Sequence, residues 1–180
     1  MTTSTDLQTR AFLILPDARL RQTFLDAMAE HERVDGRPDA DGLTMTDLRT
    51  ADGLDCYADG LRTGTAMRPG TEPMRPSVWW YVTDTPEGRT YLGRASIRHQ
   101  PVVNVLGEAG SQIWVTVRPS MRRQGLGRDM LQAILPFANA HGISEAMIEL
   151  AAENEAARAL LAFTDARVGR HARQFVLATG

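Results

Sequence analysis

One stretch in the second half of the chain constrains the fold more than any other. At residues 113–117, β-branched side chains recur at every second position, which favours a strand with two distinct faces. Pro119 ends this strand because proline has no N–H to donate to a neighbouring strand. Beyond Gly127 the apolar spacing becomes helical, and one face is formed by Leu126, Met130, Leu131, Ile134, Leu135 and Ala138. The stretch therefore predicts a strand, a turn and a helix in direct succession.

The turn between this strand and this helix has the composition of an anion site. Its sequence is Arg122-Arg-Gln-Gly-Leu-Gly127, with two glycines and several arginines. The first backbone N–H groups of a helix have no partner within the helix, and the helix dipole adds partial positive charge there. We therefore predict that this turn binds a pyrophosphate.

The remaining elements follow from the same two periodicities. We expect helices at residues 18–33, 54–63 and 154–163, and a bend at Pro136 in the helix that ends at residues 141–142. We expect strands at residues 10–16, 78–83, 90–98, 145–150, 167–169 and 171–178. Residues 35–46, 64–77 and 100–111 have the composition of loops. Hairpins in the first half and a β-α-β unit in the second predict an α/β fold with a mixed sheet.

Composition excludes several classes of protein. The 180 residues suit one domain, and a net charge of −2 gives no reason to expect nucleic-acid binding. Cys56 is the single cysteine, which excludes an intrachain disulfide and a cysteine metal cluster. Residues 1–10 are polar and lack the apolar core of a signal peptide, and no apolar run approaches the ~20 residues that span a bilayer. We therefore expect a cytoplasmic protein with neither a membrane partner nor a metal.

The strand, turn and helix resemble motif A of the GNAT N-acetyltransferase superfamily, in which Arg/Gln-x-x-Gly-x-Gly/Ala follows a hydrophobic strand. Residues 154–161, Asn-Glu-Ala-Ala-Arg-Ala-Leu-Leu, resemble motif B, whose Asn opens the next helix. Residues 93–99 and 117–120 look like a subgroup of uncharacterised bacterial proteins that are predicted acetyltransferases. The resemblance covers residues 78–175 and implies the GNAT fold, with an antiparallel N-terminal hairpin and a β-α-β half that binds acyl-CoA. A plain turn whose glycines only supply positive φ angles is the alternative.

Membership of this superfamily would make the chain an acyltransferase. The resemblance implies that an acetyl group passes from acetyl-CoA to a primary amine of a small molecule or peptide, by direct attack in a ternary complex. Residues 10–77 would then form the acceptor side, and residues 78–178 the acyl-CoA-binding core, of a single domain. A non-catalytic acyl-CoA-binding regulatory module of the same fold is the alternative. A homodimer is one option for the assembly.

The resemblance also implies which residues bind the cosubstrate. Backbone N–H groups from Arg123 to Arg128 would cradle the pyrophosphate, with the glycines allowing close approach. The pantetheine arm would pair with the strand edge, Asn154 would orient that arm or a water, and Arg158 would reach the adenosine. The full set is Val115, Thr116, Val117, Arg122, Arg123, Gln124, Gly125, Leu126, Gly127, Arg128, Asn154 and Arg158.

The catalytic acid and base are less well defined. Many relatives place a Tyr in the motif B helix to protonate the leaving thiolate. The equivalent residue here is Leu161, so another group or water must act, or the thiolate leaves unaided. Candidate bases are Glu149, His99 and Glu108. Glu149 would face a cleft or else solvent, and the alternative for His99 is a structural hydrogen bond.

The acceptor side must come from the first half of the chain. This half has an acidic bias, which would either attract a cationic amine or form a solvated surface. The bias consists of Asp35, Asp39, Asp41, Asp47, Asp52, Asp55 and Asp59. Either Trp79 and Tyr81 together or Trp80 alone would line an acceptor pocket, because neighbours on a strand face opposite sides. Packing in the core is the alternative for these three aromatic residues.

Overall fold

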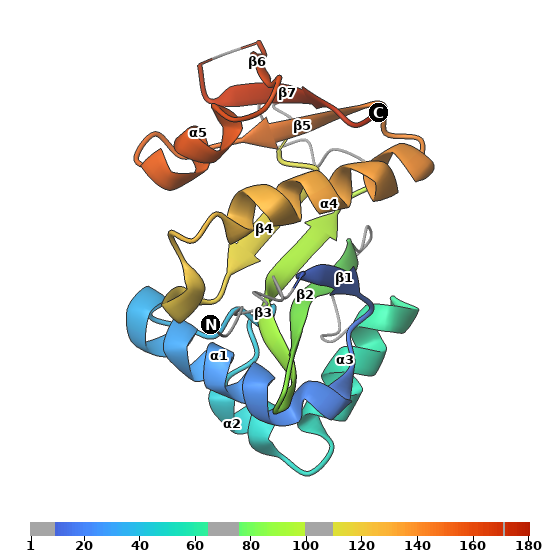
Figure 1. The fold of residues 1–180 in the computed structure, drawn as a ribbon, viewed down its shortest axis with the longest axis vertical. Helices are drawn as coiled ribbons and strands as arrows, with labels where there is room; N and C mark the ends of the chain where they lie inside the picture. Colours follow the sequence, from blue (N-terminus) through green and yellow to red (C-terminus); the bar gives the residue numbers. More distant parts are fainter. Residues whose placement is uncertain (1–9, 65–75, 100–109, 171) are drawn as a thin grey trace, which may run out of the picture.

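The computed structural model describes residues 10–64, 76–99, 110–170 and 172–180 (Figure 1). The strands are β1 (Phe12–Ile14), β2 (Ser77–Thr85), β3 (Gly88–Ile97), β4 (Ile113–Val117), β5 (Glu145–Glu149), β6 (Arg167–Val168) and β7 (Gln174–Ala178). The helices are α1 (Arg21–Asp35), α2 (Met45–Arg49), α3 (Gly53–Thr63), α4 (Leu126–Ala140) and α5 (Glu155–Leu161), with 3₁₀ turns η1 (Ala18–Leu20) and η2 (Pro119–Met121). None of the helices in these ranges is both long and apolar enough to span a membrane.

The first four strands form one antiparallel sheet in the order β1-β2-β3-β4. β2 and β3 are the predicted hairpin, in which Thr85 pairs with Gly88 across a two-residue turn. β4 packs closely against β3, since a Cβ added to Gly93 would lie 2.2 Å from the carbonyl oxygen of Thr116. β4 is the last strand of this sheet, so one of its edges faces away from β3.

The last three strands form a second antiparallel sheet in the order β5-β7-β6, which confirms the predicted closing strand pair. The α/β fold class is confirmed, but the predicted mixed sheet is not: the described strands form two separate antiparallel sheets, because β4 and β5 share no backbone ladder. The two sheets meet where the N–H of Gln112 donates to the carbonyl of Met147 (2.7 Å). β4 and β5 are therefore neighbours that share no continuous ladder.

Two apolar cores lie on opposite faces of the first sheet. On the face covered by α1, α2 and α3, Phe24 stacks on Trp80 with ring centroids 4.6 Å apart. On the other face, Trp79 packs in a core with Leu131 of α4 and Ile148 of β5. Strand alternation sends the adjacent Trp79 and Trp80 into different cores. Figure 1 shows α4 lying between the two sheets, with α1, α2 and α3 at the end of the molecule opposite the second sheet.

Local signals define the ends of the later helices as predicted. The side chain of Asn154 caps α5 by accepting a hydrogen bond from the N–H of Ala157 (3.1 Å). Gly142 follows α4 with a φ of +79°, the left-handed conformation that ends many helices. α4 continues through Pro136 without a break in the helix.

Helix α2 begins inside the segment that the sequence predicts as a loop. Thr44 and Asp47 form a capping box, in which Thr44 Oγ1 accepts from the N–H of Asp47 (3.2 Å) and the Asp47 carboxylate accepts from the N–H of Thr44 (2.7 Å). A helix of five residues is too short to show an apolar period, so only this cap signals it. Most of the other two predicted loops, residues 65–75 and 100–109, lies outside the described residues.

Candidate functional site

The turn between β4 and α4 presents a row of backbone donors. Gly125 opens α4 with a φ of +85° and no side-chain cap, and Arg123 also has a positive φ of +66°. Within the described part of the chain, the backbone N–H groups from Arg123 to Gly127 have no hydrogen-bond acceptor, whereas the N–H of Arg128, which was also predicted to cradle the pyrophosphate, donates to the carbonyl of Gly125 (2.9 Å). A Cβ added to Gly125 would meet nothing within 4 Å, so the space in front of the turn is open. This arrangement fits an anion.

Arg122, the first residue of the predicted motif, is bound to helix α1. Its guanidinium donates to both carboxylate oxygens of Asp35 (3.1 and 2.5 Å), and its Nε donates to the carbonyl of Val117 (3.2 Å). The hydrogen bond from Arg122 is the main reason why the pKa of Asp35 is lowered. Arg122 therefore joins the turn to α1 through its side chain.

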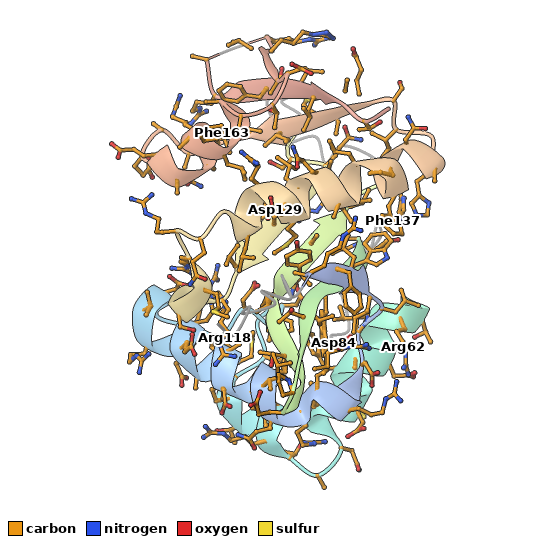
Figure 2. The ribbon with its side chains drawn as sticks, in the orientation of Figure 1. Arg62, Asp84, Arg118, Asp129, Phe137 and Phe163 are labelled. Carbon is orange, nitrogen blue, oxygen red and sulfur yellow. The ribbon has the colours of Figure 1, made fainter. Side chains whose placement is uncertain are left out.

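A second ion pair joins the same two parts of the molecule. Arg118 donates to one carboxylate oxygen of Glu30 (2.7 and 2.9 Å), and the N–H of Ser120 donates to the other (3.0 Å). Figure 2 shows Arg118 beside α1, where the chain leaves β4. Burial alone would raise the pKa of Glu30, but the hydrogen bonds from Arg118 and Ser120 outweigh it and lower the pKa to about 2.

The other polar side chains of the turn are exposed. Arg123 and Gln124 point outward, and Gln124 donates to the carbonyl of Ser120 (3.5 Å). The guanidinium of Arg128 lies over the ring of Phe163, 5.7 Å from its centroid. Arg123 and Arg128 are thus the cationic side chains that the turn itself offers to an anion.

β4 and β5 are fastened to each other at one end only. Ser111 Oγ accepts from the N–H of Glu149 (2.8 Å) and donates to its carbonyl (3.0 Å), and Gln112 Oε1 accepts from the N–H of Met147 (3.0 Å). Side chains thus supplement the backbone bond from Gln112 to Met147 at this point. Beyond it, no strand among the described residues pairs with this edge of β4, which we call the free edge.

Backbone pairing shows which groups of β4 face this edge. The carbonyl of Gln112 accepts from the N–H of Arg98, and the N–H of Arg118 bonds to the carbonyl of Leu92, so the backbone groups of Trp114 and Thr116 between them face β3, although the N–H of Gln112 itself turns to β5. Because backbone groups alternate along an antiparallel strand, those of Val115 face the opposite edge. The N–H of Val115 is therefore directed toward β5.

A small cavity of about 130 Å³ lies along this free edge. It is enclosed by β4, β5, α4 and α5 and is mainly apolar, with lining residues that include Val115, Leu131, Ile148 and Leu161. We call it the edge cavity. Its size and apolar lining suit the end of an extended, uncharged chain.

A larger cavity of about 490 Å³ lies over the other face of β3 and β4. Its walls come from the end of α1, residues 37–42 and the strand residues Ser96, Arg98 and Thr116. We call it the face cavity. Ser111 and Trp114 line both cavities, so the two meet at the start of β4.

The face cavity contains an ion pair between a buried guanidinium and a partly exposed carboxylate. The guanidinium of Arg94, 7% exposed, donates to both carboxylate oxygens of Asp41 (3.0 Å each) and to the hydroxyl of Tyr57 (3.1 Å). Burial alone would lower the pKa of Arg94, but Tyr57 and Asp41 outweigh it and raise the pKa. Burial likewise opposes the effect of Arg94 on Asp41, whose pKa is lowered. Both groups stay charged, and the wall of the cavity is fixed.

The predicted catalytic residues lie in different places. Glu149 lines the edge cavity, with its carboxylate 3.8 Å from Arg173 and 26% exposed. His99 lines neither cavity; strand alternation turns it toward α4, where it lies 4.6 Å from the ring of His141 and 2.9 Å from Ser77 Oγ. Burial, followed by the charge of His141, lowers the pKa of His99. Glu108 lies outside the described residues.

Motif B contributes lining residues to the edge cavity. Asn154 lines the cavity although its side chain also caps α5, and Leu161 is buried there at 5% exposure. Arg158 is half-buried on the same helix but is not among the lining residues. Ser111 supplies the side-chain hydroxyl of the edge cavity.

Some acidic residues of the first half line the face cavity, whereas the other acidic residues and the aromatic residues of β2 lie on the surface or in the cores. Asp35, Asp39 and Asp41 line the face cavity. On the surface, Asp55 pairs with Arg21, and Asp59 pairs with Arg62. The three aromatic residues of β2 are all buried in the two cores and line neither cavity: Trp79, Trp80 and Tyr81.

Ser111, Arg94 and His31 are among the site residues that were not predicted from the sequence. His31 had a readable signal, because it follows Phe24 and Met28 at the spacing of one buried helix face. Arg94 and Ser111 had none, because their partners are 53 and 38 residues away in the chain. No group of side chains in the described ranges has the composition of a metal site.

The arrangement brings two compartments to one point. An anion held at the Gly125 turn would lie at one end of the free edge of β4, and an extended chain attached to it would follow that edge into the edge cavity. A second molecule would enter the face cavity from the other side of the sheet. The two would meet beside Ser111 and Trp114.

Comparison with known proteins identifies this architecture. A family model described as the acetyltransferase (GNAT) family matches residues 55–163, more than half of the chain. No curated protein matches the sequence significantly.

Solved structures share the fold at low sequence identity. A Vibrio cholerae protein provisionally named a ribosomal-protein-serine acetyltransferase is similar with a TM-score of 0.59 and 14% identity, over 94% of both chains. RimL, a ribosomal L7/L12 α-N-protein acetyltransferase, gives 0.57 and 13% over 94% of this chain and 88% of its own. The microcin C7 self-immunity acetyltransferase MccE, solved with acetyl-CoA and AMP, gives 0.55 and 9% over 93% of this chain and 90% of its own.

Proposed function

Since the chain belongs to the acetyltransferase (GNAT) family, we propose that it transfers an acetyl group from acetyl-CoA to a primary amine by direct attack while both substrates are bound. The amine belongs to a small molecule or to a peptide. One observation carries this proposal: the edge cavity and the face cavity lie on opposite sides of β4 and share Ser111 and Trp114. A donor and an acceptor bound in separate cavities can therefore react without either leaving its own site.

The donor side depends mainly on backbone groups. The N–H groups from Arg123 to Gly127 would hold the pyrophosphate, with Arg123 and Arg128 adding charge. The free edge of β4 would pair with the pantetheine arm, as an added strand does. The apolar edge cavity would receive the thioester end. Arg122 supports this site indirectly, because its pairing with Asp35 fixes the turn against α1.

The chemical step needs an oxyanion donor and an exit for protons. The N–H of Val115, directed toward the free edge, is placed to donate to the oxyanion that forms when an amine attacks the thioester carbonyl. Glu149 lines the same cavity and can accept a proton there. Leu161 stands where many relatives have Tyr, so we assign protonation of the leaving thiolate to water; with an ordinary thiol pKa of about 8.5 the thiolate is a moderate leaving group.

Two measurements test this function together. Isothermal titration with acetyl-CoA measures donor binding, and a thiol-release assay over a panel of primary amines and amino-terminal peptides measures transfer. We expect micromolar binding and thiol release that depends on the amine. Binding without release on every amine would favour the alternative function, a regulatory module that senses acyl-CoA. Absence of binding would refute both functions.

A matched pair of glycine variants tests the anion site. Gly125 and Gly142 stand at opposite ends of α4, with φ of +85° and +79° and with nothing within 4 Å of an added Cβ. Gly125→Glu and Gly142→Glu therefore impose similar backbone strain, but only Gly125→Glu places a carboxylate in front of the N–H row. We expect Gly125→Glu to raise the Kd of acetyl-CoA at least about 100-fold, equivalent to about 2.7 kcal/mol, and Gly142→Glu to leave it unchanged. Equal Kd values for both variants would refute the assignment of the turn.

A further inference from the structure

His31 is a buried histidine with one free nitrogen beside the face cavity. It lies on the inner face of α1, is 1% exposed and lines the cavity. Its Nδ1 lies 2.7 Å from Oδ2 of Asp35. Its Nε2 is enclosed and has no hydrogen-bond partner in the described part of the chain. A buried polar atom without a partner is costly to fold, so its position next to a substrate cavity calls for a ligand.

Asp35 determines which nitrogen of His31 carries the proton. The hydrogen bond from Arg122 is the largest effect on the pKa of Asp35 and lowers it, so Asp35 is a carboxylate at neutral pH. A carboxylate can only accept, so Nδ1 must be the donor, and in the neutral imidazole Nε2 keeps its lone pair. An imidazole held in this way by an acid is oriented as a base, by the same logic as in a catalytic triad.

The acidic and basic residues that line the cavity around His31 balance in number, and in the part of the chain that the structure describes Asp39 is the carboxylate that offers an unpartnered oxygen to a cationic acceptor. Asp35 is on its own helix, with Arg122 of the β4–α4 turn bound to it. The charged residues that line the rest of the cavity are Arg37, Asp39, Asp41, Arg94 and Arg98. Arg94 and Asp41 compensate each other, whereas Oδ2 of Asp39 is enclosed and unpartnered among the described residues. An ammonium group bound in this cavity can donate to a carboxylate oxygen or to an unprotonated imidazole nitrogen.

Resting on the proposed function, we propose that His31, oriented by Asp35, is the base that removes a proton from the acceptor ammonium in the face cavity. Nε2 takes one proton, directly or through one water, and the His31 imidazolium returns it to solvent. The neutral amine then forms the C–N bond to the acyl carbon, and the C–S bond breaks with its electron pair on sulfur. The second nitrogen proton passes through water to that thiolate, so one proton is released per turnover.

His31→Gln tests the proposal, with His141→Gln as its control. His141 lies at the end of α4 and lines neither cavity. We expect His31→Gln to lower kcat at least about 100-fold, the ordinary contribution of a general base, with the Kd of acetyl-CoA unchanged. The acidic limb of the wild-type kcat/KM profile should be absent in His31→Gln and present in His141→Gln. Added imidazoles should restore turnover to His31→Ala in proportion to their basicity, which a purely structural role would not produce.

The outcomes separate this proposal from the proposed function. If the wild type acetylates an amine but His31→Gln keeps its kcat and its acidic limb, the role of His31 is refuted and the acetyltransferase function stands. If the His31 variants do not fold, long-range ¹⁵N–¹H NMR spectra of the wild type still decide the matter. A proton on Nδ1 with a bare Nε2 that responds to the bound amine supports the proposal. A proton on Nε2 contradicts it, whether or not the wild type turns over.

Discussion

The two sides of the first sheet are built from different kinds of interaction. On the side of α4, the candidate donor site consists of backbone N–H groups, a strand edge and an apolar cavity. On the side of α1, the face cavity is defined by paired side chains, among them Arg94 with Asp41 and His31 with Asp35. Backbone groups are the same in every sequence with this fold, whereas side-chain pairs are particular to one sequence. The difference suits a cosubstrate shared by a family and an acceptor specific to this chain.

The comparison predicts that variants on the α1 side lose folding stability because they leave a charged group without its counter-charge. Arg94→Met should have the largest effect, because it leaves Asp41 without its partner and removes a donor to Tyr57. Breaking a buried pair by removing one partner costs about 3–5 kcal/mol, and the 41% exposure of the Asp41 side chain puts the expected loss near ~3 kcal/mol. Urea unfolding at neutral pH measures it.

The control for Arg94→Met is a surface pair with the same chemistry. Arg62 and Asp59 are 2.8 Å apart with side chains 44% and 60% exposed, so Arg62→Met should cost less than about 0.5 kcal/mol. Adding Asp41→Asn to Arg94→Met should recover part of the loss, because the uncompensated charge is removed. Equal losses in Arg94→Met and Arg62→Met would mean that buried charge does not hold the α1 side.

A variant of Glu30 tests the contact that joins α1 to the chain after β4. Its folded pKa of about 2 lies below the ordinary 4.5, so its stabilisation is fully present above about pH 5 and is lost as the pH falls toward 2. We expect Glu30→Gln to cost about 2 kcal/mol at pH 7, because Gln keeps one acceptor oxygen but leaves Arg118 without a counter-charge. The difference from wild type in urea midpoint should shrink between pH 5 and pH 2.

The neighbouring Glu32 provides the control for this pH dependence. It is exposed on the same helix, so Glu32→Gln should follow the wild type at every pH. A difference between wild type and Glu30→Gln that stays constant down to pH 2 would contradict the ion pair with Arg118.

Ser111 should give the smallest of these effects and the one most specific to the donor side. Ser111→Ala removes both hydrogen bonds that fasten β4 to Glu149 and leaves that N–H without its acceptor, at a cost of about 1–2 kcal/mol. We also expect the Kd of acetyl-CoA to rise about 5-fold, because the strand edge loses its fixed position. Ser77→Ala, which removes a hydrogen bond to His99 away from both cavities, should leave this Kd unchanged. Similar Kd values for the two variants would mean that the hydrogen bonds between Ser111 and Glu149 do not affect donor binding.

The same contrast explains what could be predicted from the sequence. The donor side is local: strand, turn, helix and the Asn154 cap each follow from neighbouring residues, and all lie as expected. The face cavity joins segments far apart in the chain; Arg118 and Glu30, for example, are separated by 88 residues. Periodicity and spacing contain no information on such pairs. The separation of β4 from β5 could not be predicted either, because it depends on hydrogen bonds that join the side chains of Ser111 and Gln112 to the backbone of β5.

His99 shows the limit of residue type as a guide to function. It has the chemistry of a base, but its place in the alternation of β3 turns it toward α4. His31 has the same chemistry, and its place on the inner face of α1 brings it to the face cavity. For two identical side chains, the position within the element decides which one can meet a substrate.

The meeting of two cavities at the start of β4 has a consequence for the size of the acceptor. The face cavity reaches the surface through exposed residues such as Arg37 and Gly42, and the donor occupies the opposite side of the sheet under the proposed function. The two substrates therefore use separate entrances, and the donor can be exchanged while the acceptor stays in place. The 490 Å³ of the face cavity has to admit only the amine and the atoms next to it. An acceptor as large as a folded protein can remain outside with a single arm inserted.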